Sequence, residues 1–365
     1  MKLVIFGLTV SSSWGNGHAT LWRGFIKALA RRGWEVVFYE RDVPYYAGAR
    51  DLTELPGGRL VLYPDWAEIS ASAARDVADA DAAMVTSYCP DGIAASRLVC
   101  EQGAALRLFY DLDTPVTLSH FEQGRPVAYI GPEGLAGFDL VLSYTGGGAL
   151  DALRTMLGAR RVAPLYGHVD PDVHAPGEPN PAFSGDLSYL GTYAEDRQAE
   201  LDRLFVAPAR REHDRRFVMG GAQYPHDFPW AANIHFVRHL PPADHPSFYA
   251  SSRLTLNVTR QAMAALGWCP SGRLFEAAAC GATLLTDTWA GLETFFELGR
   301  EVIPVTTTLD VIAALDRPDA ELRRIGTAAR ERVLAEHTSD RRAAEFEALL
   351  AGLGRPVSQL AGEDA

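Results

Sequence analysis

The chain has 365 residues, of which 47% are hydrophobic and 22% are charged. This length predicts two packed domains, since one domain usually takes roughly 100 to 200 residues, and the composition is that of a globular protein. The formal net charge of -12 argues against sequence-independent binding to nucleic acids, because that mode needs a basic surface, although a local basic pocket for one diphosphate is compatible with it.

The first half of the sequence alternates apolar runs typical of strands with helical patterns. Residues 3–10 form a short apolar run, residues 20–32 carry apolar side chains at helical spacing, and Gly33 stands where a helix C-cap is expected. A strand at 34–39 then completes a β-α-β unit. Further strands are predicted at 59–63, 82–86, 106–110, 140–143 and 161–165, with helical segments at 91–102 and 149–157. This alternation predicts an α/β fold with a parallel sheet covered on both faces.

Residues 168–184 are rich in Pro, Gly, Asp and Asn, which interrupt regular structure. We place the boundary there, with a first domain at 1–175 and a second at 184–338. The second series of strands is expected at 186–191, 216–220, 234–237, 254–258, 283–286 and 301–305, with helices at 195–205 and after Ser271. From Asp319 the sequence predicts two helices.

The N-terminal segment and the cysteines indicate where in the cell the protein is located. The first apolar run has one basic residue and leads directly into a glycine-rich loop, so we interpret it as a strand rather than a signal peptide. No apolar run approaches the roughly 20 residues needed to cross a bilayer. The four cysteines are too few and too scattered for a disulfide framework. We expect a cytoplasmic protein.

The loop after the first strand is the first candidate site. It contains Trp14, Gly15, Asn16, Gly17 and His18. Glycines at a strand-to-helix turn let a ligand approach the backbone, and the helix N-terminus presents free N–H groups. Histidine titrates near neutral pH, so His18 is a candidate general base. The alternative is that the glycines only form a tight turn and His18 packs or caps the helix. The glycine spacing does not match a dinucleotide-binding fingerprint.

A second candidate site is the segment Y-D-L-D-T-P-V-T, which follows a predicted strand. Asp111 and Asp113 would lie where open α/β sheets bind ligands. A phosphatase of the haloacid-dehalogenase type would need Thr or Val where the chain has Pro115, and a D-x-D metal clamp would need another fold. We expect an acceptor-site or loop-structuring role, and the alternative is Asx-turn capping by both carboxylates.

The third candidate site is the segment C-P-S-G-R-L-F-E-A-A-A-C-G at 269–281. Ser271 and Gly272 begin a helix whose N–H groups can hold a diphosphate, Arg273 adds a forked cationic donor, and Glu276 can accept both ribose hydroxyls. The alternative is a helix-surface pair of Arg273 and Glu276.

Further candidates follow other predicted strands. The turn at Gly146 and Gly147 would face the same edge of the first sheet. Candidates in the second half, which could contact a nucleotide, are Gly191, Thr192, Tyr193, Gly221, His239 and Arg260. Arg260 is a candidate second phosphate partner, and His239 could present backbone groups to a nucleobase. A surface arginine and an accommodated histidine are the alternatives.

Several segments together resemble one family. The chain resembles the CgeB-like spore-maturation glycosyltransferases in the segments S-S-W-G-N-G-H-A-T, E-R-D-V-P-Y-Y, Y-D-L-D-T-P-V-T-L, S-Y-T-G-G, P-L-Y-G-H-V-D-P-D-V-H and S-G-R-L-F-E-A-A-A-C-G. The resemblance implies the GT-B fold, in which two Rossmann-like domains face each other across a cleft. It also implies acceptor binding in the first domain, nucleotide sugar in the second, and return of the terminal helix (340–352) to the first. Matching positions are Gly15, Gly17, His18, Arg273 and Glu276.

The hypothesis from the sequence is transfer of a hexosyl group from a nucleoside diphosphate sugar, most simply UDP-linked, to a hydroxyl acceptor. His18 would be the base, and Asp111 or Asp113 would be an acceptor ligand or helper. Arg260 with Arg273 would stabilise the leaving diphosphate in place of a metal, so no cofactor or metal is expected. Retaining enzymes with an E-x7-E motif carry glutamate where this chain has Cys269, which leaves the stereochemistry open. The rival hypotheses are a nucleotide-sugar epimerase or hydrolase, and a non-catalytic coat-assembly protein.

Overall fold

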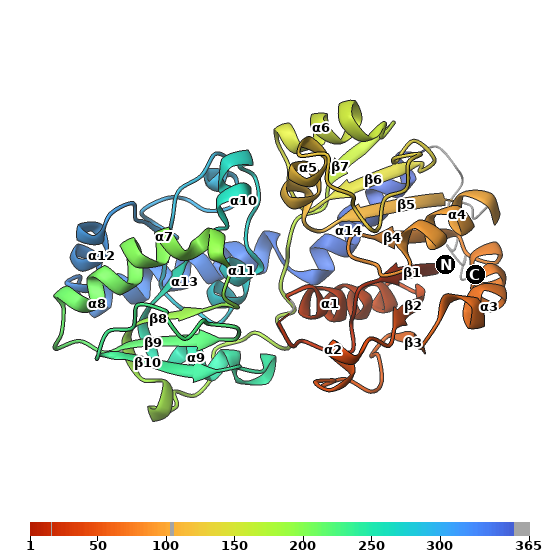
Figure 1. Ribbon diagram of the computed structural model, residues 1–365. Coiled ribbons are helices and arrows are strands. Elements are labelled where there is room, and N and C mark those ends of the chain that lie inside the picture. The colour runs from red at the N-terminus through yellow and green to blue at the C-terminus, as the bar shows by residue number, and fades with distance from the viewer. Residues whose placement is uncertain (16, 103–105, 354–365) are drawn as a thin grey trace. The chain divides into compact units, whose positions relative to one another are not determined.

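The computed structural model describes residues 1–15, 17–102 and 106–353 (Figure 1). The chain divides into two compact units. The first contains Met1–Ser12, His18–Tyr166 and the chain from Asp340, and the second contains residues 13–15 and 17 with Gly167–Ser339. Both units are parallel α/β sheets, which confirms the α/β fold class predicted from the sequence.

The first unit is a seven-stranded parallel sheet in the order β3-β2-β1-β4-β5-β6-β7 (Figure 1). Its strands are β1 (Lys2–Gly7), β2 (Glu35–Arg41), β3 (Gly58–Tyr63), β4 (Ala82–Thr86), β5 (Leu106–Asp111), β6 (Leu140–Ser143) and β7 (Val162–Pro164). Its helices are α1 (His18–Arg31), α2 (Pro44–Ala47), α3 (Trp66–Ala78), α4 (Gly92–Gln102), α5 (Thr114–Glu122) and α6 (Gly148–Leu157). The strand order reverses between β1 and β4, and such a switch point is where doubly wound sheets bind ligands.

The helix α14 (Ser339–Ala351) completes the core of this unit. Ala343, Phe346 and Leu350 recur at helical spacing and are buried in the same cluster as Phe25 and Trp34. The Phe346 ring lies edge-on to Phe25, with 5.5 Å between ring centroids. The last described helix therefore packs against residues from the beginning of the chain.

The second unit is a six-stranded parallel sheet in the order β10-β9-β8-β11-β12-β13. Its strands are β8 (Gly185–Leu190), β9 (Phe217–Gly221), β10 (Ile234–Arg238), β11 (Ser252–Asn257), β12 (Leu284–Thr286) and β13 (Ile303–Pro304). Its helices are α7 (Gln198–Leu201), α8 (Ala207–Arg211), α9 (His245–Ala250), α10 (Gln261–Leu266), α11 (Gly272–Ala279), α12 (Thr308–Leu315) and α13 (Asp319–Glu336). A π-helical segment at Asp202–Val206 joins α7 to α8, so the helix expected at 195–205 continues to Arg211.

Four non-glycine residues adopt a left-handed backbone. They are Tyr88 (φ 61°), Gln223 (φ 66°), His239 (φ 50°) and Trp268 (φ 43°). The first three follow β4, β9 and β10, and the fourth precedes α11. Such conformations cost about 1–3 kcal/mol each and concentrate at functional sites. They draw attention to the loops at the carboxyl ends of the strands.

Within the described residues, no helix combines the length and apolar character that a membrane span requires.

Candidate functional site

Arg273 lies at the centre of a polar cluster in the second unit. It belongs to the first turn of α11, which Ser271 precedes in an extended conformation. Its Nη1 donates a hydrogen bond to Asn257 Oδ1 over 3.1 Å, and its guanidinium carbon lies 5.1 Å from the centroid of the Tyr189 ring. The guanidinium is thus held from two sides beside the positive end of a helix dipole, an arrangement suited to an anionic ligand.

Gly191 and Gly221 allow the chain to approach this cluster closely. A Cβ at Gly191 would lie 2.6 Å from Arg273 Nη2, and a Cβ at Gly221 would lie 2.0 Å from the Gly191 carbonyl oxygen. Tyr224 donates a hydrogen bond from its hydroxyl to the same Gly191 oxygen over 3.0 Å. Gly221 is required by the local packing, because a Cβ there would meet backbone atoms. A Cβ at Gly191 would meet only the ends of the Arg273 and Tyr189 side chains, which would have to shift.

Residues 192 and 193 continue this loop through backbone contacts. The Thr192 carbonyl accepts a hydrogen bond from Arg197 Nη1 over 3.0 Å, and the Tyr193 N–H donates to the Ala222 carbonyl over 2.9 Å. The loop after β8 is thereby fixed to the loop after β9.

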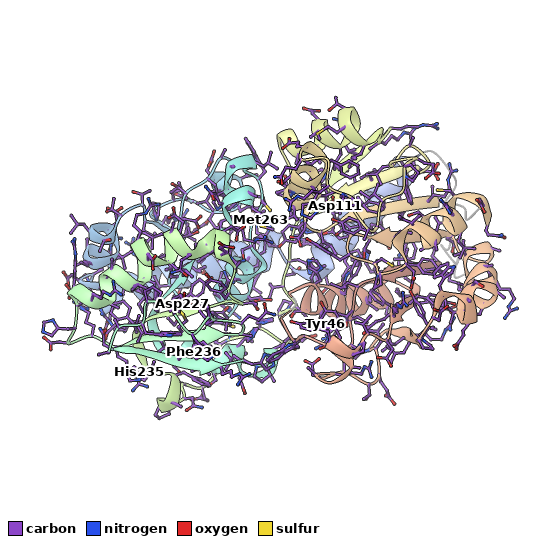
Figure 2. The ribbon with its side chains drawn as sticks, viewed as in Figure 1. Tyr46, Asp111, Asp227, His235, Phe236 and Met263 are labelled. Carbon is purple, nitrogen blue, oxygen red and sulfur yellow. The ribbon has the colours of Figure 1, made fainter. Side chains whose placement is uncertain are left out.

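Tyr224 also belongs to an aromatic cluster that the sequence analysis did not predict. Its ring centroid lies 5.1 Å from that of Phe228 and 5.3 Å from that of Phe236, and Trp230 lies 5.1 Å from Phe236. Phe236 is 39% exposed on β10, where Figure 2 labels it beside His235. An accessible aromatic surface therefore adjoins the polar cluster.

A buried carboxylate, Asp287, orients the residues that contact Arg273. Asp287 Oδ1 accepts hydrogen bonds from the Thr259 N–H and hydroxyl, both over 3.0 Å. Asn257 Nδ2 donates to Thr286 Oγ1 over 3.1 Å and to Asp287, which turns its Oδ1 toward Arg273. Burial raises the pKa of Asp287 to about 6. Asp287 is therefore a positioning residue, a role that was not predicted from the sequence.

Arg260 begins the segment that leads into α10, where its Nε donates to Asp196 Oδ2 over 2.9 Å. Its charge is thus already compensated by a carboxylate, and a phosphate would have to share or displace that partner.

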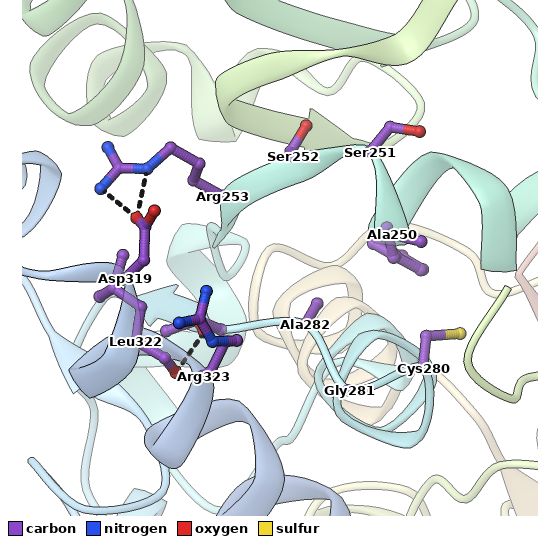
Figure 3. A pocket seen from close by; sticks show the side chains of 12 residues that line it. Ala250, Ser251, Ser252, Arg253, Cys280, Gly281, Ala282, Asp319, Leu322 and Arg323 are labelled. Carbon is purple, nitrogen blue, oxygen red and sulfur yellow. Dashed lines mark hydrogen bonds and ion pairs between the residues drawn. The ribbon is translucent and has the colours of Figure 1, made fainter. Parts of the chain in front are cut away.

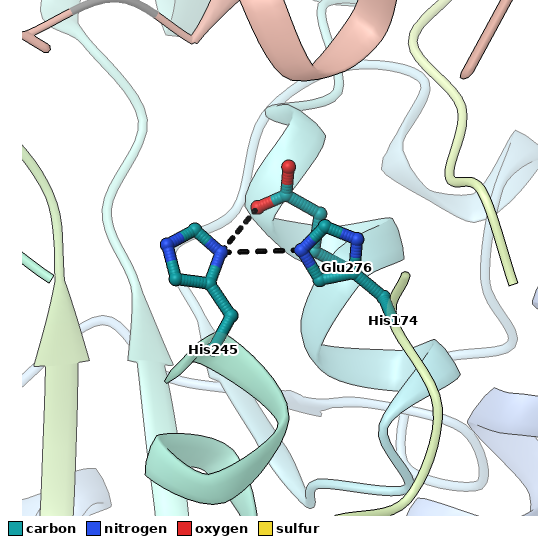
Figure 4. Close-up of side chains that lie close together, drawn as sticks. All are labelled: His174, His245 and Glu276. Carbon is teal, nitrogen blue, oxygen red and sulfur yellow. Dashed lines mark hydrogen bonds and ion pairs between the residues drawn. The ribbon is translucent and has the colours of Figure 1, made fainter. Parts of the chain in front are cut away.

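Glu276 lies one turn after Arg273 on α11 and faces two histidines (Figure 4). Its Oε2 is 4.0 Å from His245 Nδ1, and His174 Nε2 is 3.1 Å from the same nitrogen. Burial lowers the pKa of both histidines to about 4, so both rings are neutral at neutral pH. In the described part of the chain, these three residues are the group that could hold a metal ion.

The first predicted loop is only partly described. Asn16 lies outside the described residues. Gly15 has a left-handed backbone (φ 60°), and Trp14 places its ring 4.6 Å from that of His239. The His239 N–H donates to the Gly221 carbonyl over 2.7 Å. Trp14, Gly15 and Gly17 group with the second unit, and His18 groups with the first.

His18 and Asp113 form the candidate site of the first unit. His18 is the first residue of α1, and its Nε2 lies 3.6 Å from Asp113 Oδ2. The side chains are 20% and 16% exposed, respectively, so both are accessible to a ligand. Asp113 immediately precedes α5. The sequence prediction that these two residues serve one site is compatible with this geometry.

Asp111, which is labelled in Figure 2, differs from Asp113 in its environment. It is fully buried, and its Oδ1 accepts hydrogen bonds from the Asp113 N–H and the Thr117 hydroxyl, both over 3.1 Å. Burial raises the pKa of Asp111 to about 7. Within the described residues its Oδ2 has no hydrogen-bond partner. The bond to Asp113 is that of an Asx turn, the alternative considered from the sequence, so Asp113 is the carboxylate that faces His18.

Glu40 is a buried residue that the sequence analysis did not single out. It ends the buried part of β2, and it accepts hydrogen bonds from the Thr9 hydroxyl, the Val10 N–H, and the N–H and hydroxyl of Ser11. One carboxylate thus organises the chain leading to the loop before His18. The signal in the sequence is an acidic residue directly after an apolar strand.

Gly146 and Gly147 lie between β6 and α6, with Gly147 (φ 56°) at the helix N-cap. The hydroxyl of the nearby Ser143 forms a hydrogen bond with the Thr114 hydroxyl over 2.7 Å, which connects the end of β6 to the start of α5.

An open pocket of about 320 Å³ lies elsewhere in the second unit (Figure 3). Its lining includes Ser252 at the start of β11 and Thr283 just before β12, together with Arg253 and Asp319, which form an ion pair at 2.7 Å. It therefore lies at the amino ends of parallel strands, the edge opposite Arg273.

Comparisons with known proteins agree with this fold. Residues 197–348 match a family described as glycosyl transferase-like. No curated protein matches the chain in sequence. Sucrose-phosphate synthase from Thermosynechococcus elongatus is similar in structure, with a TM-score of 0.70, 14% identity, and coverage of 96% of this chain and 98% of that one.

Two further structures resemble the chain over similar lengths. Anabaena HepE in complex with UDP-glucose has a TM-score of 0.69 and 10% identity, covering 96% of this chain and 100% of that chain. The catalytic domain of starch synthase IV from Arabidopsis thaliana, bound to ADP and acarbose, has a TM-score of 0.66 and 11% identity, covering 97% and 99%. The matched region and the shared architecture define the class, a glycosyltransferase with the GT-B fold. The two parallel α/β domains expected for the GT-B fold are confirmed.

Proposed function

We propose that the protein transfers a hexosyl group from a UDP-sugar to a hydroxyl-bearing acceptor without requiring a metal ion. The observation that carries this proposal is the placement of Arg273 at the start of α11, between Asn257 and Tyr189, with Glu276 one turn further on. A cation at a helix N-terminus suits a diphosphate, and a nearby carboxylate suits the ribose hydroxyls. In this proposal the second unit binds the donor and the first binds the acceptor.

The choice of UDP is supported by one structural relative, since HepE has been obtained with UDP-glucose. Starch synthase IV was bound to ADP, so the base has to be tested. In our assignment the α11 N-terminus and Arg273 hold the diphosphate, Glu276 holds the ribose, and the backbone around His239 meets the base. Arg260 would become a second phosphate partner by loosening its bond to Asp196.

The chemistry assigned to the first unit is proton transfer. His18 removes the proton from the acceptor hydroxyl, Asp113 favours the protonated imidazole that results, and Asp111 holds the turn that positions Asp113. The acceptor oxygen forms a bond to the anomeric carbon as the bond to the diphosphate oxygen breaks. Arg273 stabilises the charge on the leaving diphosphate. Cys269 occupies the place of the first E-x7-E glutamate and is buried, so this motif does not supply a second carboxylate.

We further assign the protein to the CgeB-like type and to the cytoplasm. The CgeB-like assignment is supported by motifs that now lie at strand ends, including the segment with Asp111 and Asp113 and the segment with Arg273 and Glu276.

Donor binding is tested by thermal shift with UDP, dTDP, GDP, ADP and CDP, each with and without EDTA. Ligand at about 100 times its dissociation constant should stabilise the protein by roughly 2.7 kcal/mol. We expect a selective shift with UDP that EDTA does not reduce and that Glu276→Ala diminishes. A shift that EDTA abolishes would contradict metal-independent binding, and no shift with any nucleotide would contradict the donor assignment.

Transfer itself is tested by incubating the protein with donor alone and with candidate acceptors. We expect sugar transfer only when an acceptor is present. Conversion of the donor alone would favour an epimerase or hydrolase of the same fold, and binding without turnover would favour a non-catalytic binding protein.

A further inference from the structure

Three side chains with metal-binding atoms converge in the second unit from separate segments. His174 lies in a turn after β7, His245 is the first residue of α9, and Glu276 lies in α11 (Figure 4). Their ligand atoms all lie within 4.8 Å of one another. We propose that His174, His245 and Glu276 form a binding site for one divalent transition-metal ion of the Zn²⁺ class.

The distances are close to those that a tetrahedral ion imposes. Metal–ligand bonds of about 2.0–2.1 Å place two ligand atoms about 3.3 Å apart in a tetrahedral site. His174 Nε2 and His245 Nδ1 are separated by 3.1 Å, and His245 Nδ1 and Glu276 Oε2 by 4.0 Å. The two imidazoles therefore need little change, whereas the Glu276 carboxylate has to move closer to them to complete the site.

The donor set and its surroundings fit such an ion. Two imidazoles and one carboxylate, with the fourth position open, form a known type of zinc site. His174 is fully buried, whereas the side chains of His245 and Glu276 are 12% and 17% exposed, which leaves access for the ion and for a water ligand. His245 also forms a hydrogen bond with the backbone of Leu240, the type of contact that orients metal-ligating histidines.

The local charges define what kind of site this is. Glu276 supplies a negative charge, and Asp170 lies close enough to His174 to favour positive charge there. Arg273 acts on His245 in the opposite sense. The site therefore relies on direct coordination by nitrogen rather than on excess negative charge, which favours Zn²⁺, Co²⁺ or Ni²⁺ over Mg²⁺ or Ca²⁺.

Metal binding has a consequence that rests on the proposed function. Glu276 is the carboxylate assigned to the ribose, and coordination of an ion would withdraw its Oε2 from that role. The ion is thus an inhibitor of donor binding and takes no part in metal-independent transfer.

The first experiment measures metal binding without nucleotide. Chelator-treated full-length protein is titrated with Zn²⁺ against a chromophoric chelator, and Co²⁺ is used to detect four-coordinate visible absorbance. We expect one equivalent to bind, with affinity reduced more than about 10-fold in His174→Asn, His245→Asn and Glu276→Gln. His213→Asn, which changes an exposed histidine of the same unit, is the control and should bind as the parent does.

Thermal unfolding in metal-free buffer checks that each variant is folded. If a buried histidine variant does not fold, Glu276→Gln still tests the site, because Glu276 is partly exposed. The proposal is overturned if the parent binds no stoichiometric Zn²⁺, or if Glu276→Gln binds Zn²⁺ as tightly as the parent and the His213→Asn control do.

The second experiment measures UDP affinity with and without Zn²⁺. We expect Zn²⁺ to weaken UDP binding to the parent and to have a much smaller effect on His174→Asn, which keeps Glu276 and reports direct complexation of Zn²⁺ by UDP. An equal effect on both proteins would overturn inhibition through this site. If UDP fails to bind in metal-free buffer while Zn²⁺ binds, the proposed function fails and the metal site stands.

Discussion

The two units of the protein share a parallel α/β architecture but place different chemistry at the carboxyl ends of their strands. The first presents an imidazole and a carboxylate, His18 and Asp113, 3.6 Å apart. The second presents a guanidinium, Arg273, held by an amide and an aromatic ring. The sheet topology thus determines where ligands bind, and the loop residues determine whether the site transfers protons or binds phosphates.

The carboxylates buried beneath these two sites differ in the same way. Asp287 uses one oxygen to accept bonds from Thr259 and Asn257, and it thereby fixes the amide that holds Arg273. Asp111 has an oxygen with no partner in the described chain, and burial raises its pKa further, to about 7 against about 6. In the second unit the buried carboxylate therefore helps to fix the cation of Arg273. In the first unit the buried carboxyl group of Asp111, whose pKa is raised, stabilises a turn.

Arg273→Ala should give the largest effect. Removal of a donor to a developing charge typically costs about 10²–10³ in rate, and loss of the cation should also weaken nucleotide binding. Steady-state kinetics and UDP titration measure both. Arg253→Ala is the matched control, since this arginine is paired with Asp319 at the opposite edge of the same sheet. Equal losses in the two variants would contradict the assignment of Arg273.

His18→Ala should sharpen the contrast between the units. Loss of a general base should reduce kcat by about 10²-fold or more, while the UDP affinity should stay at the parent's value because donor binding is assigned to the second unit. Asp113→Asn should show a smaller loss in kcat of the same kind. A His18→Ala protein that transfers sugar at the parent's rate would remove the base assignment, and one that loses UDP affinity would break the division of roles.

The last prediction concerns the folding stability of the protein rather than its activity, and it depends on the two buried carboxylates, Asp111 and Asp287. A raised pKa in the folded state means that folded Asp111 holds its proton between about pH 4 and 7, where the unfolded chain has lost it. Stability from this group is therefore present at low pH and is lost as the pH rises through about 7, with a slope of at most about 1.4 kcal/mol per pH unit.

Urea unfolding across this range should show a flatter pH dependence for Asp111→Asn. Asp287→Asn should flatten the curve only up to about pH 6. Curves that stay parallel to the parent's for both variants would show that neither carboxyl group titrates in this range.

The strands could be predicted because buried parallel strands are short apolar runs, as in residues 82–86 and 140–143. Some helices were missed although the sequence contains their start signals. One example is α3, which begins after the Asp65 cap. Another is α12, which has a capping box of Thr307 and Asp310. The positions of Arg273 and Glu276 could be predicted because Ser271 and Gly272 mark the start of their helix in the sequence.

The rest of the candidate site depends on contacts between distant segments. His174 and His245 are 71 residues apart, and no spacing rule connects them. Glu40 is visible as an acidic residue at the end of an apolar run, but its hydrogen-bond donors on residues 9–11 come close only when the chain folds. The difference in role between Asp111 and Asp113 likewise depends on their burial, which the D-x-D spacing does not predict.

The packing of α14 has a consequence for synthesis on the ribosome. The first unit needs Ala343, Phe346 and Leu350 to fill the core around Phe25, and these residues are translated only after the whole second unit. The N-terminal segment must therefore wait with an incomplete core, while the second unit already has all of its strands. Nascent chains should consequently acquire protease resistance in the later-translated unit first, the reverse of the usual N-terminal order.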